Sequence, residues 1–325
     1  MQTEIDLTQD LSILNILLAD RTSGKNVIWA TNDYTALGPD YMADKEITPE
    51  LLFINNEKVV KPRKDKMLSQ QDSRTRERAE VFTPSWVCNA QNNLVDDAWF
   101  QKKVKRFNSE TDKSWKTNYH KISFSQNPGK TWQDYVRANR LEVSCGEAPY
   151  LTSRYDTVTG NMIPVKSRVG LLDRKLRVIG ENTDDSKNWL DWAKIALQST
   201  YGFEWQGDNV CLARQNMLMT TVEHYCHKFQ TSPEEALLLQ FAEIISWNIW
   251  QMDGIKFVIP NSCRSVTEFE QSFFDIKTTV KPCPGCESGD CFRHNGIYAT
   301  IMDWEENKVI RFVDLVGGGK RNGTI

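Results

Sequence analysis

Three acidic residues each end a short apolar segment and precede a turn. The segments begin at Arg140, Ser199 and Asn248, and they end at Glu142, Glu204 and Asp253. Carboxylates at the carboxyl ends of parallel strands accept hydrogen bonds from ligand hydroxyls and amines. The small residues Ser144, Cys145 and Gly146 after the first acid allow a ligand to approach the backbone closely. We therefore expect one crevice for a nucleoside-like ligand, although such acids also occur in ordinary strand–loop–helix connections.

A second set of residues has the chemistry of a metal site. Cys283, Cys286, Cys291 and His294 form the pattern C-x2-C-x4-C-x2-H, with Pro284 and Gly285 between the first two cysteines. Thiolates two residues apart around a turn can supply half of a tetrahedral zinc site, and a second pair nearby can complete it. The alternative is a loop with free thiols. If the site forms, all four positions are filled, so we expect a structural zinc ion.

Alternating strands and helices must position the three acids. The pattern predicts strands ending at Glu142 and Glu204, with a helix after Glu204. Leu11 to Asp20 has the spacing of an amphipathic helix, and Lys25 to Thr31 is typical of a buried strand. Ser232-Pro233-Glu234-Glu235 predicts a helix start with Ser232 as its cap. We expect an α/β fold with a mostly parallel, doubly wound sheet.

The same segments carry a family resemblance. Glu142 to Leu151 (EVSCGEAPYL) resembles the cofactor loop of N6-adenine DNA methyltransferases, which reads acid-Pro-Ala-Cys-Gly-Ser-Gly-x-aromatic-Leu. Val143 replaces the Pro of that loop, and Ala148 replaces its second Gly. Tyr201 to Leu218 resembles the motif Tyr-Gly-x-Asp with a following Leu-Ala-x-x-Asn-Leu helix, and Asn248 to Gly254 resembles Asn-Ile-x-x-x-Asp. Phe82-Thr83-Pro84 resembles the segment that precedes the cofactor loop.

This resemblance implies a Rossmann-like fold that binds S-adenosylmethionine, and it implies roles for individual residues. Phe82, Thr83 and Pro84 would cover the methionine portion of the cofactor. Glu142, Ser144, Cys145 and Gly146 would hold its amino-acid part. Glu204 would accept from the ribose hydroxyls, Trp205 would pack on the adenine, and Asp253 would accept from the adenine amino group. The order of the motifs resembles that in modification subunits of restriction-modification systems.

The catalytic motif of that family, Asn-Pro-Pro-Tyr or Asp-Pro-Pro-Tyr, has no counterpart here. It binds the amino group of a flipped adenine and stacks on the base. No Pro-Pro occurs in the chain, and Lys308 to Gly318, which resembles the strand before the motif, runs into Gly319-Lys320-Arg321. Three alternatives to a complete DNA methyltransferase therefore stay open. They are an incomplete module that binds cofactor or DNA and works with a partner subunit, a scaffold without activity, and a metal-dependent nuclease using Asp275.

Composition sets the remaining expectations. The chain has 325 residues, 40% hydrophobic and 26% charged, with a formal net charge of −3. Binding to DNA must therefore come from local basic patches or from a partner. No apolar run approaches the roughly 20 residues of a membrane span, and we expect a cytoplasmic protein without a disulfide framework. We expect an N-terminal segment of helix and strand over 1–73, a methyltransferase-like cofactor-binding domain over 74–260, and a Cys-rich C-terminal appendage over 261–325 that holds the possible zinc site and a final strand.

Overall fold

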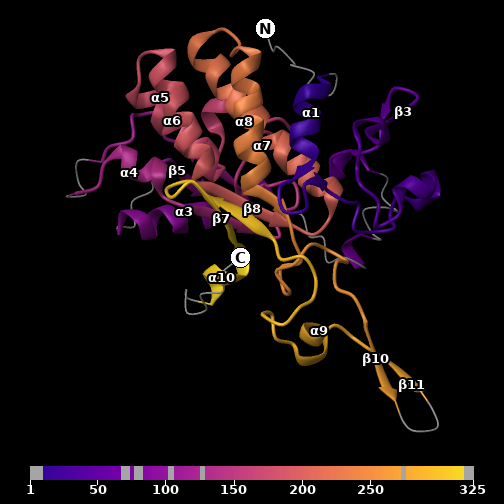
Figure 1. Cartoon of the computed structure of the whole chain (residues 1–325). Helices are drawn as coiled ribbons and strands as arrows, with labels where there is room; N and C mark the ends of the chain where they lie inside the picture. Colours follow the sequence, from indigo (N-terminus) through magenta and orange to yellow (C-terminus); the bar gives the residue numbers. More distant parts are fainter. Residues whose placement is uncertain are drawn as a thin grey trace.

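The computed structural model describes residues 10–66, 74–76, 83–101, 106–124, 129–271 and 276–317. Within them the protein is mixed α/β and is built on a three-stranded parallel sheet (Figure 1). The strand order is β7-β8-β9, with β7 at Arg140–Val143, β8 at Thr200–Glu204 and β9 at Ile249–Gln251. Glu142 pairs with Gly202, and Glu204 pairs with Gln251. The carboxyl ends of the strands therefore meet at one edge of the sheet.

Four helices connect the three strands and pack on one face of the sheet. They are α5 (Leu171–Asn182), α6 (Ser186–Gln198), α7 (Gly207–Phe229) and α8 (Glu235–Asn248). α7 is buried along most of its length, so residues on all its sides belong to the core. Its first residue must be glycine, because a Cβ at Gly207 would lie 2.0 Å from the carbonyl oxygen of Ile28.

A side-chain cap is found at the start of α1 but not at the start of α8. Asp10 accepts from the backbone of Ser12 and Ile13 at the start of α1 (Leu11–Leu18), as expected for the predicted helix. The start of α8 differs from the prediction. Its cap is Glu234 rather than Ser232, and its side chain makes no cap hydrogen bond.

The N-terminal segment shares the core of the sheet domain. Ile13, Leu14 and Leu17 of α1 pack in the same cluster as the helices α5 to α8. The side chain of Gln251 in β9 accepts from the Ile28 N–H and donates to the Ile28 carbonyl. Of the predicted strand over Lys25 to Thr31, only β2 (Lys25–Asn26) is a regular strand. Short elements make up the rest of the segment: β1 (Ala19–Asp20), β2 (Lys25–Asn26), β3 (Phe53–Ile54), β4 (Glu57–Lys58) and the 3-10 turns Thr35–Leu37, Pro39–Tyr41, Pro49–Leu52 and Arg63–Asp65.

The segment before the first sheet strand carries a helix, a hairpin and a short helix. These are α3 (Ser85–Phe100), the antiparallel pair β5 (Asn108–Thr111) and β6 (Ser114–Thr117), and α4 (Trp132–Arg137). A buried polar cluster holds α3 to α5. Arg174 donates to Asp96, Asn89 and Asn93 from a side chain that is 1% exposed.

The C-terminal part forms two hairpins. One is β10 (Val266–Gln271) with β11 (Ile276–Lys281), which projects from the body in Figure 1 and is followed by α9 (Pro284–Ser288). The other is β12 (Thr300–Asp303) with β13 (Lys308–Arg311), which leads into α10 (Phe312–Val316). Ala299 and Ile301 pack on Phe203 and Trp250 of the sheet. The strand that resembles the approach to the catalytic motif therefore pairs antiparallel with β12.

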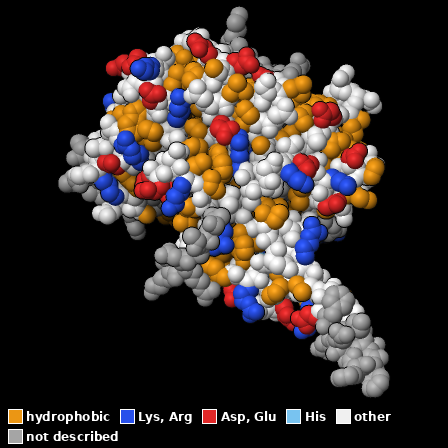
Figure 2. All heavy atoms as spheres, viewed as in Figure 1, with side chains coloured by type: hydrophobic (Ala, Val, Ile, Leu, Met, Phe, Trp, Pro, Cys, Tyr) orange, Lys and Arg blue, Asp and Glu red, His pale blue; other side chains and the backbone are white. Residues whose placement is uncertain are grey.

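The predicted α/β class is confirmed at this level, with parallel strands and a Cys/His cluster near the C-terminus. On the face that Figure 2 shows, basic and acidic side chains are interspersed, in keeping with the small net charge. Among the helices of the described part, none is long and apolar enough to cross a bilayer.

Candidate functional site

A cavity of about 1080 Å³ opens where β7 and β8 end. Two loops that follow the strands form its floor, one at Ser144–Gly146 and one at Trp205–Gln206. The structure thus brings together, around one cavity, seven residues to which the family resemblance gives a cofactor role: Thr83, Glu142, Ser144, Cys145, Gly146, Glu204 and Trp205.

The loop after β7 has an unusual backbone. Ser144, Gly146 and Ala148 all have positive φ, at 50°, 52° and 64°. Only glycine adopts this region without cost. Ala148, which replaces the second glycine of the cofactor-loop pattern, therefore keeps a glycine-like backbone while its methyl group is fully buried.

The two carboxylates at the strand ends hold this loop in shape. Glu142 accepts from the N–H groups of Tyr150 and Leu151, at 3.3 and 3.2 Å. Glu204 accepts from the N–H of Gly146 at 2.9 Å and from that of Gln206 at 3.1 Å. Burial raises the pKa of Glu142 well above its usual range, against the lowering effect of these two backbone donors. Each carboxylate oxygen has two lone pairs and can accept more than one hydrogen bond.

Gln206 adds a polar atom that the sequence did not single out. Gln206 is 4% exposed and lines the cavity. Its side-chain oxygen Oε1 is buried without a hydrogen-bond partner among the described residues. A buried acceptor without a partner is costly, and a ligand donor would satisfy it. Its position directly after Glu204-Trp205 was the only sequence signal for it.

The N-terminal segment supplies the opposite wall of the cavity. Thr31, Asn32 and Met42 line it, together with Asn261 from beyond the sheet. Asn261 donates from Nδ2 to the carbonyl of Ala30, which itself has φ of 62°. Sequence reasoning missed this wall, because none of these residues belongs to a recognisable motif.

Three predicted cofactor residues lie elsewhere or are not described. Asp253 does not line the cavity. Its Oδ1 accepts from the N–H groups of Ile255 and Lys256 and closes the turn after β9. Pro84 caps α3 and is also absent from the cavity lining. Phe82 lies outside the described residues.

The two motif asparagines have structural roles. Asn216 of α7 donates to the carbonyl of Glu147 at 2.9 Å and so ties the cofactor-like loop to the helix. Asn248 donates to the carbonyls of Leu197, Gln198 and Thr200, where α6 passes into β8. Asn216 therefore fixes the loop that lines the cavity, whereas Asn248 fixes backbone at the amino end of β8, away from the cavity.

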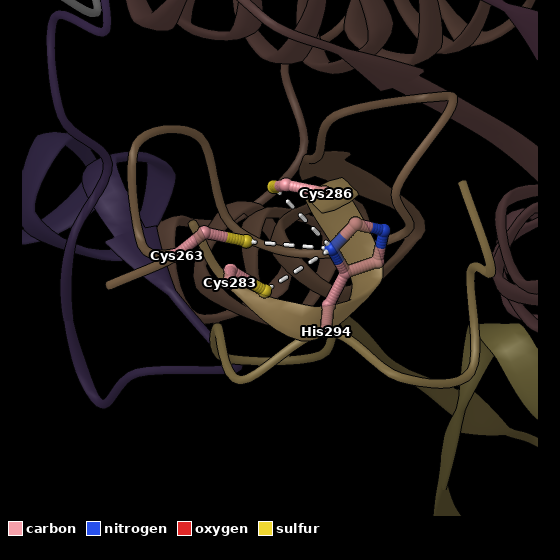
Figure 3. A group of neighbouring side chains, drawn as sticks. All are labelled: Cys263, Cys283, Cys286 and His294. Atoms are coloured by element: carbon pink, nitrogen blue, oxygen red, sulfur yellow. Dashed lines mark hydrogen bonds between the residues drawn. The ribbon is translucent and has the colours of Figure 1, made fainter. Parts of the chain in front are cut away.

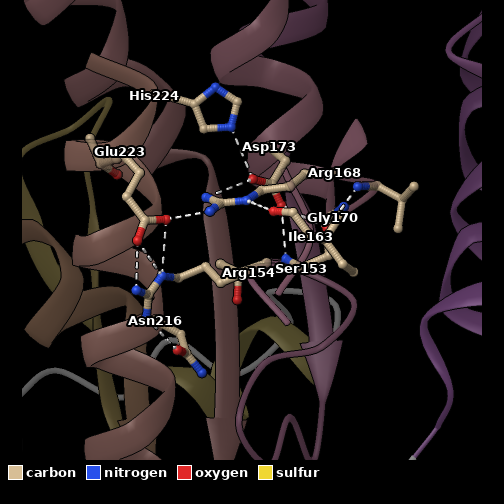
Figure 4. Close-up of polar contacts among 12 residues, drawn as sticks. Ser153, Arg154, Ile163, Arg168, Gly170, Asp173, Asn216, Glu223 and His224 are labelled. Carbon is tan, nitrogen blue, oxygen red and sulfur yellow. Dashed lines mark hydrogen bonds and ion pairs between the residues drawn. The ribbon is translucent and has the colours of Figure 1, made fainter. Parts of the chain in front are cut away.

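A polar network continues from that loop along α7 (Figure 4). Arg154 donates to Glu223 at 2.6 Å, and Arg168 pairs with the same carboxylate at 2.5 Å. Asp173 accepts from the N–H of Ser153 and contacts His224 Nε2 at 2.9 Å. His224 thus has a carboxylate partner within the core.

The second site is a cluster of three cysteines and one histidine (Figure 3). Cys263, Cys283 and Cys286 direct their Sγ atoms at Nδ1 of His294, at 3.6, 3.6 and 3.7 Å. All four ligand atoms lie within 4.8 Å of one another, so the group can hold a metal ion such as zinc.

One member of this cluster differs from the prediction. Cys263 takes the place assigned to Cys291, which is not part of the group. Because β10 pairs antiparallel with β11, Cys263 before the hairpin lies next to Cys283 after it. The distance between these cysteines in the sequence gives no sign of this contact. The carbonyl of Cys291 instead accepts from the Tyr298 hydroxyl. Asp275 of the nuclease alternative lies outside the described residues.

Comparisons with protein-family models, with curated proteins and with solved structures find no match to this chain.

Proposed function

We propose that this chain is the modification subunit of a restriction-modification system, an S-adenosylmethionine-dependent adenine-N6 DNA methyltransferase with a Rossmann-like sheet. One observation carries the proposal. Segments whose motifs resemble that family, and which lie far apart in the sequence, line a single cavity at the ends of β7 and β8. Binding crevices of parallel sheets lie at this edge.

The residues of the cavity fit the polar groups of such a cofactor. Glu204 offers carboxylate oxygens for ribose hydroxyls, and Trp205, half-buried in the lining, offers a ring for the adenine. Gln206 Oε1 offers an acceptor for the adenine amino group, the part that the resemblance gives to Asp253. The bound cofactor would supply an activated methyl group, and the chain's own task would be to hold it at the cavity mouth and exclude water.

A second candidate is that the chain works only with a partner subunit that supplies the catalytic motif. The observation that favours it is the outer edge of β7. In the described sheet β7 has a neighbour on one side only, and Leu141 and Val143 on this strand are 45% and 65% exposed. An exposed edge strand with apolar side chains is a site for pairing with another chain.

Calorimetric titration with S-adenosylmethionine tests the proposal. The unmodified chain should bind it, and Trp205→Ala should weaken binding by up to roughly tenfold, as expected for the loss of about 0.5–1.5 kcal/mol of aromatic contact. Trp192→Ala is the matched control, because Trp192 is also half-buried and packs on Trp132 away from the cavity. Absence of binding by the folded, unmodified chain would refute the proposal.

The two candidates differ in methyl transfer. With radiolabelled S-adenosylmethionine and unmethylated DNA, a complete enzyme would label adenine without any addition. A module that needs a partner would bind the cofactor equally well and label nothing until the partner subunit is added.

A further inference from the structure

The β10–β11 hairpin is held to the body at a segment that has almost no apolar core. Of the residues between 261 and 297 whose side chains the structure describes, Cys283 is the sole apolar one that is buried. Val266 and Val280 of the hairpin are 36% and 66% exposed. A segment of this size needs another source of stability, and in small domains a metal ion commonly provides it.

The Cys/His cluster lies where that stability is needed. Cys263 precedes β10 by three positions, and Cys283 follows β11 by two, so these ligands bracket the hairpin. Cys286 belongs to α9, and His294 follows α9 in the loop that returns to the body. One ion at this point would join both ends of the hairpin to the returning loop (Figure 3).

The distances match those of a tetrahedral ion. With zinc–sulfur bonds of about 2.3 Å and zinc–nitrogen bonds of about 2.0–2.1 Å, sulfur and nitrogen ligands lie about 3.6 Å apart. The three Sγ–Nδ1 distances here are 3.6, 3.6 and 3.7 Å. Three thiolates with one imidazole are a ligand set typical of structural zinc.

Neighbouring groups orient the ligands. The N–H of Asn295 donates to Cys283 Sγ at 3.2 Å, and the N–H of His294 donates to the Tyr298 hydroxyl at 2.9 Å. Asn295 also bonds both backbone groups of Arg264, next to Cys263. Gly285 leaves room for the imidazole, because a Cβ there would lie 2.5 Å from His294 Nδ1. Such contacts around the ligands fix their orientation and raise metal affinity.

We propose that Cys263, Cys283, Cys286 and His294 Nδ1 bind one zinc ion that clamps the base of the β10–β11 hairpin. Binding displaces the protons of the three thiols, and the neutral imidazole donates its Nδ1 lone pair. The ion is structural, since the four protein ligands fill its coordination sphere. The clamp is independent of the cavity function proposed above.

Zinc content of the full-length chain, purified without added metal, tests the ligand set. The unmodified protein should retain about one zinc per chain, and Cys263→Ser should lose it. Cys291→Ser is the matched control, because Cys291 lies in the same loop outside the cluster and should keep the ion. Loss of zinc from Cys291→Ser with retention in Cys263→Ser would overturn the assignment, and so would a zinc-free protein with a disulfide in its non-reduced mass spectrum.

Hydrogen–deuterium exchange with and without a zinc chelator tests the clamp. Chelation should raise exchange in 261–268 and 278–297, while α5 to α8 stay protected. The exchange of Cys263→Ser should match that of the chelated protein, which also shows that the variant is folded. Unchanged exchange in these segments after zinc removal would overturn the clamp.

Discussion

The strand-end cavity and the Cys/His cluster are built on opposite principles. The cavity collects residues from segments as distant as Thr31, Glu142 and Asn261 and rests on a sheet with a large apolar core. The cluster takes its ligands from the segment 263–294, where the described residues have almost no core. We therefore expect the first site to be held by the folded core alone, and the second to depend on a bound ion for its stability.

The polar groups of the two sites differ in whether the protein itself supplies their partners. In the cavity, Glu142 and Glu204 are already bonded to backbone N–H groups of their own loops. In the cluster, three thiols converge on a single nitrogen atom, an arrangement that a cation completes. A substitution in one of the two regions should therefore change the stability of that region and leave the other unchanged.

The largest effect is expected from Asp208→Asn at the cavity scaffold. Asp208, in the first turn of α7, is 2% exposed and accepts from Lys66, Arg74 and the Tyr34 hydroxyl. Removing its charge takes away the carboxylate that Lys66 and Arg74 share, while Arg74 keeps its ion pair with Asp33 at 3.3 Å. We expect a loss of about 3–5 kcal/mol in the free energy of unfolding, measured by urea titration at pH 7.

The β10–β11 hairpin offers a control substitution for Asp208→Asn. Glu268 and Lys281 form an ion pair across the β10–β11 hairpin, with side chains 47% and 45% exposed. Glu268→Gln should change the urea midpoint of the body by less than the error, because exposed pairs contribute about 0–1 kcal/mol. A comparable loss from both substitutions would contradict the view that the two regions are stabilised separately.

Asp208 also predicts a pH dependence of stability. Burial by itself would raise the pKa of this carboxyl, but Lys66 and Arg74 outweigh it, and the folded-state pKa is lowered from its ordinary value. Its contribution is therefore present above the unfolded pKa of about 3.9 and is lost as pH falls toward the folded value. Urea midpoints measured from pH 6 down to pH 3 should fall more steeply for the unmodified chain than for Asp208→Asn.

The features that could be predicted from the sequence are those set by neighbouring residues along the chain. Glu142, the turn at Ser144–Gly146 and Glu204 were predictable because each acid lies at a strand end beside its own turn, and parallel strands bring such ends together. The N-terminal wall was not predictable, because Thr31 and Asn32 meet the cavity only through tertiary packing. Asp253 follows the same sequence pattern as the other acids, yet it closes its own turn.

The cluster was predictable in three of its four ligands for a related reason. Cys283, Cys286 and His294 are close in sequence, so their spacing alone indicates a site. Cys263 becomes a neighbour only because the β10–β11 pairing returns the chain, a contact that spacing rules do not contain. Cys291 satisfied the spacing but not the geometry.

A smaller effect, confined to the cluster, is expected from Gly285→Ala. The added Cβ would lie 2.5 Å from His294 Nδ1 and displace the imidazole. We expect zinc affinity to fall roughly 10–100-fold, measured by competition with a chromogenic chelator. Gly180→Ala in α5 is the control, because its Cβ would meet only ordinary contacts at 3.9 Å. Equal zinc affinity in Gly285→Ala and the unmodified chain would count against His294 as a ligand.

The smallest effect is expected from the cofactor-like loop, where two substitutions should act in opposite directions. Ser144 is exposed and has φ of 50°, so Ser144→Gly relieves left-handed strain and should stabilise by about 0.5–1 kcal/mol. Gly146 has φ of 52°, and no atom lies within 4 Å of the place that an alanine methyl group would take, so Gly146→Ala should cost about 1 kcal/mol through backbone strain alone. Urea unfolding measures both, and zinc content should not change. Effects of the same sign would show that the loop does not hold this backbone in solution, and the fit of the cavity to a cofactor would lose its geometric basis.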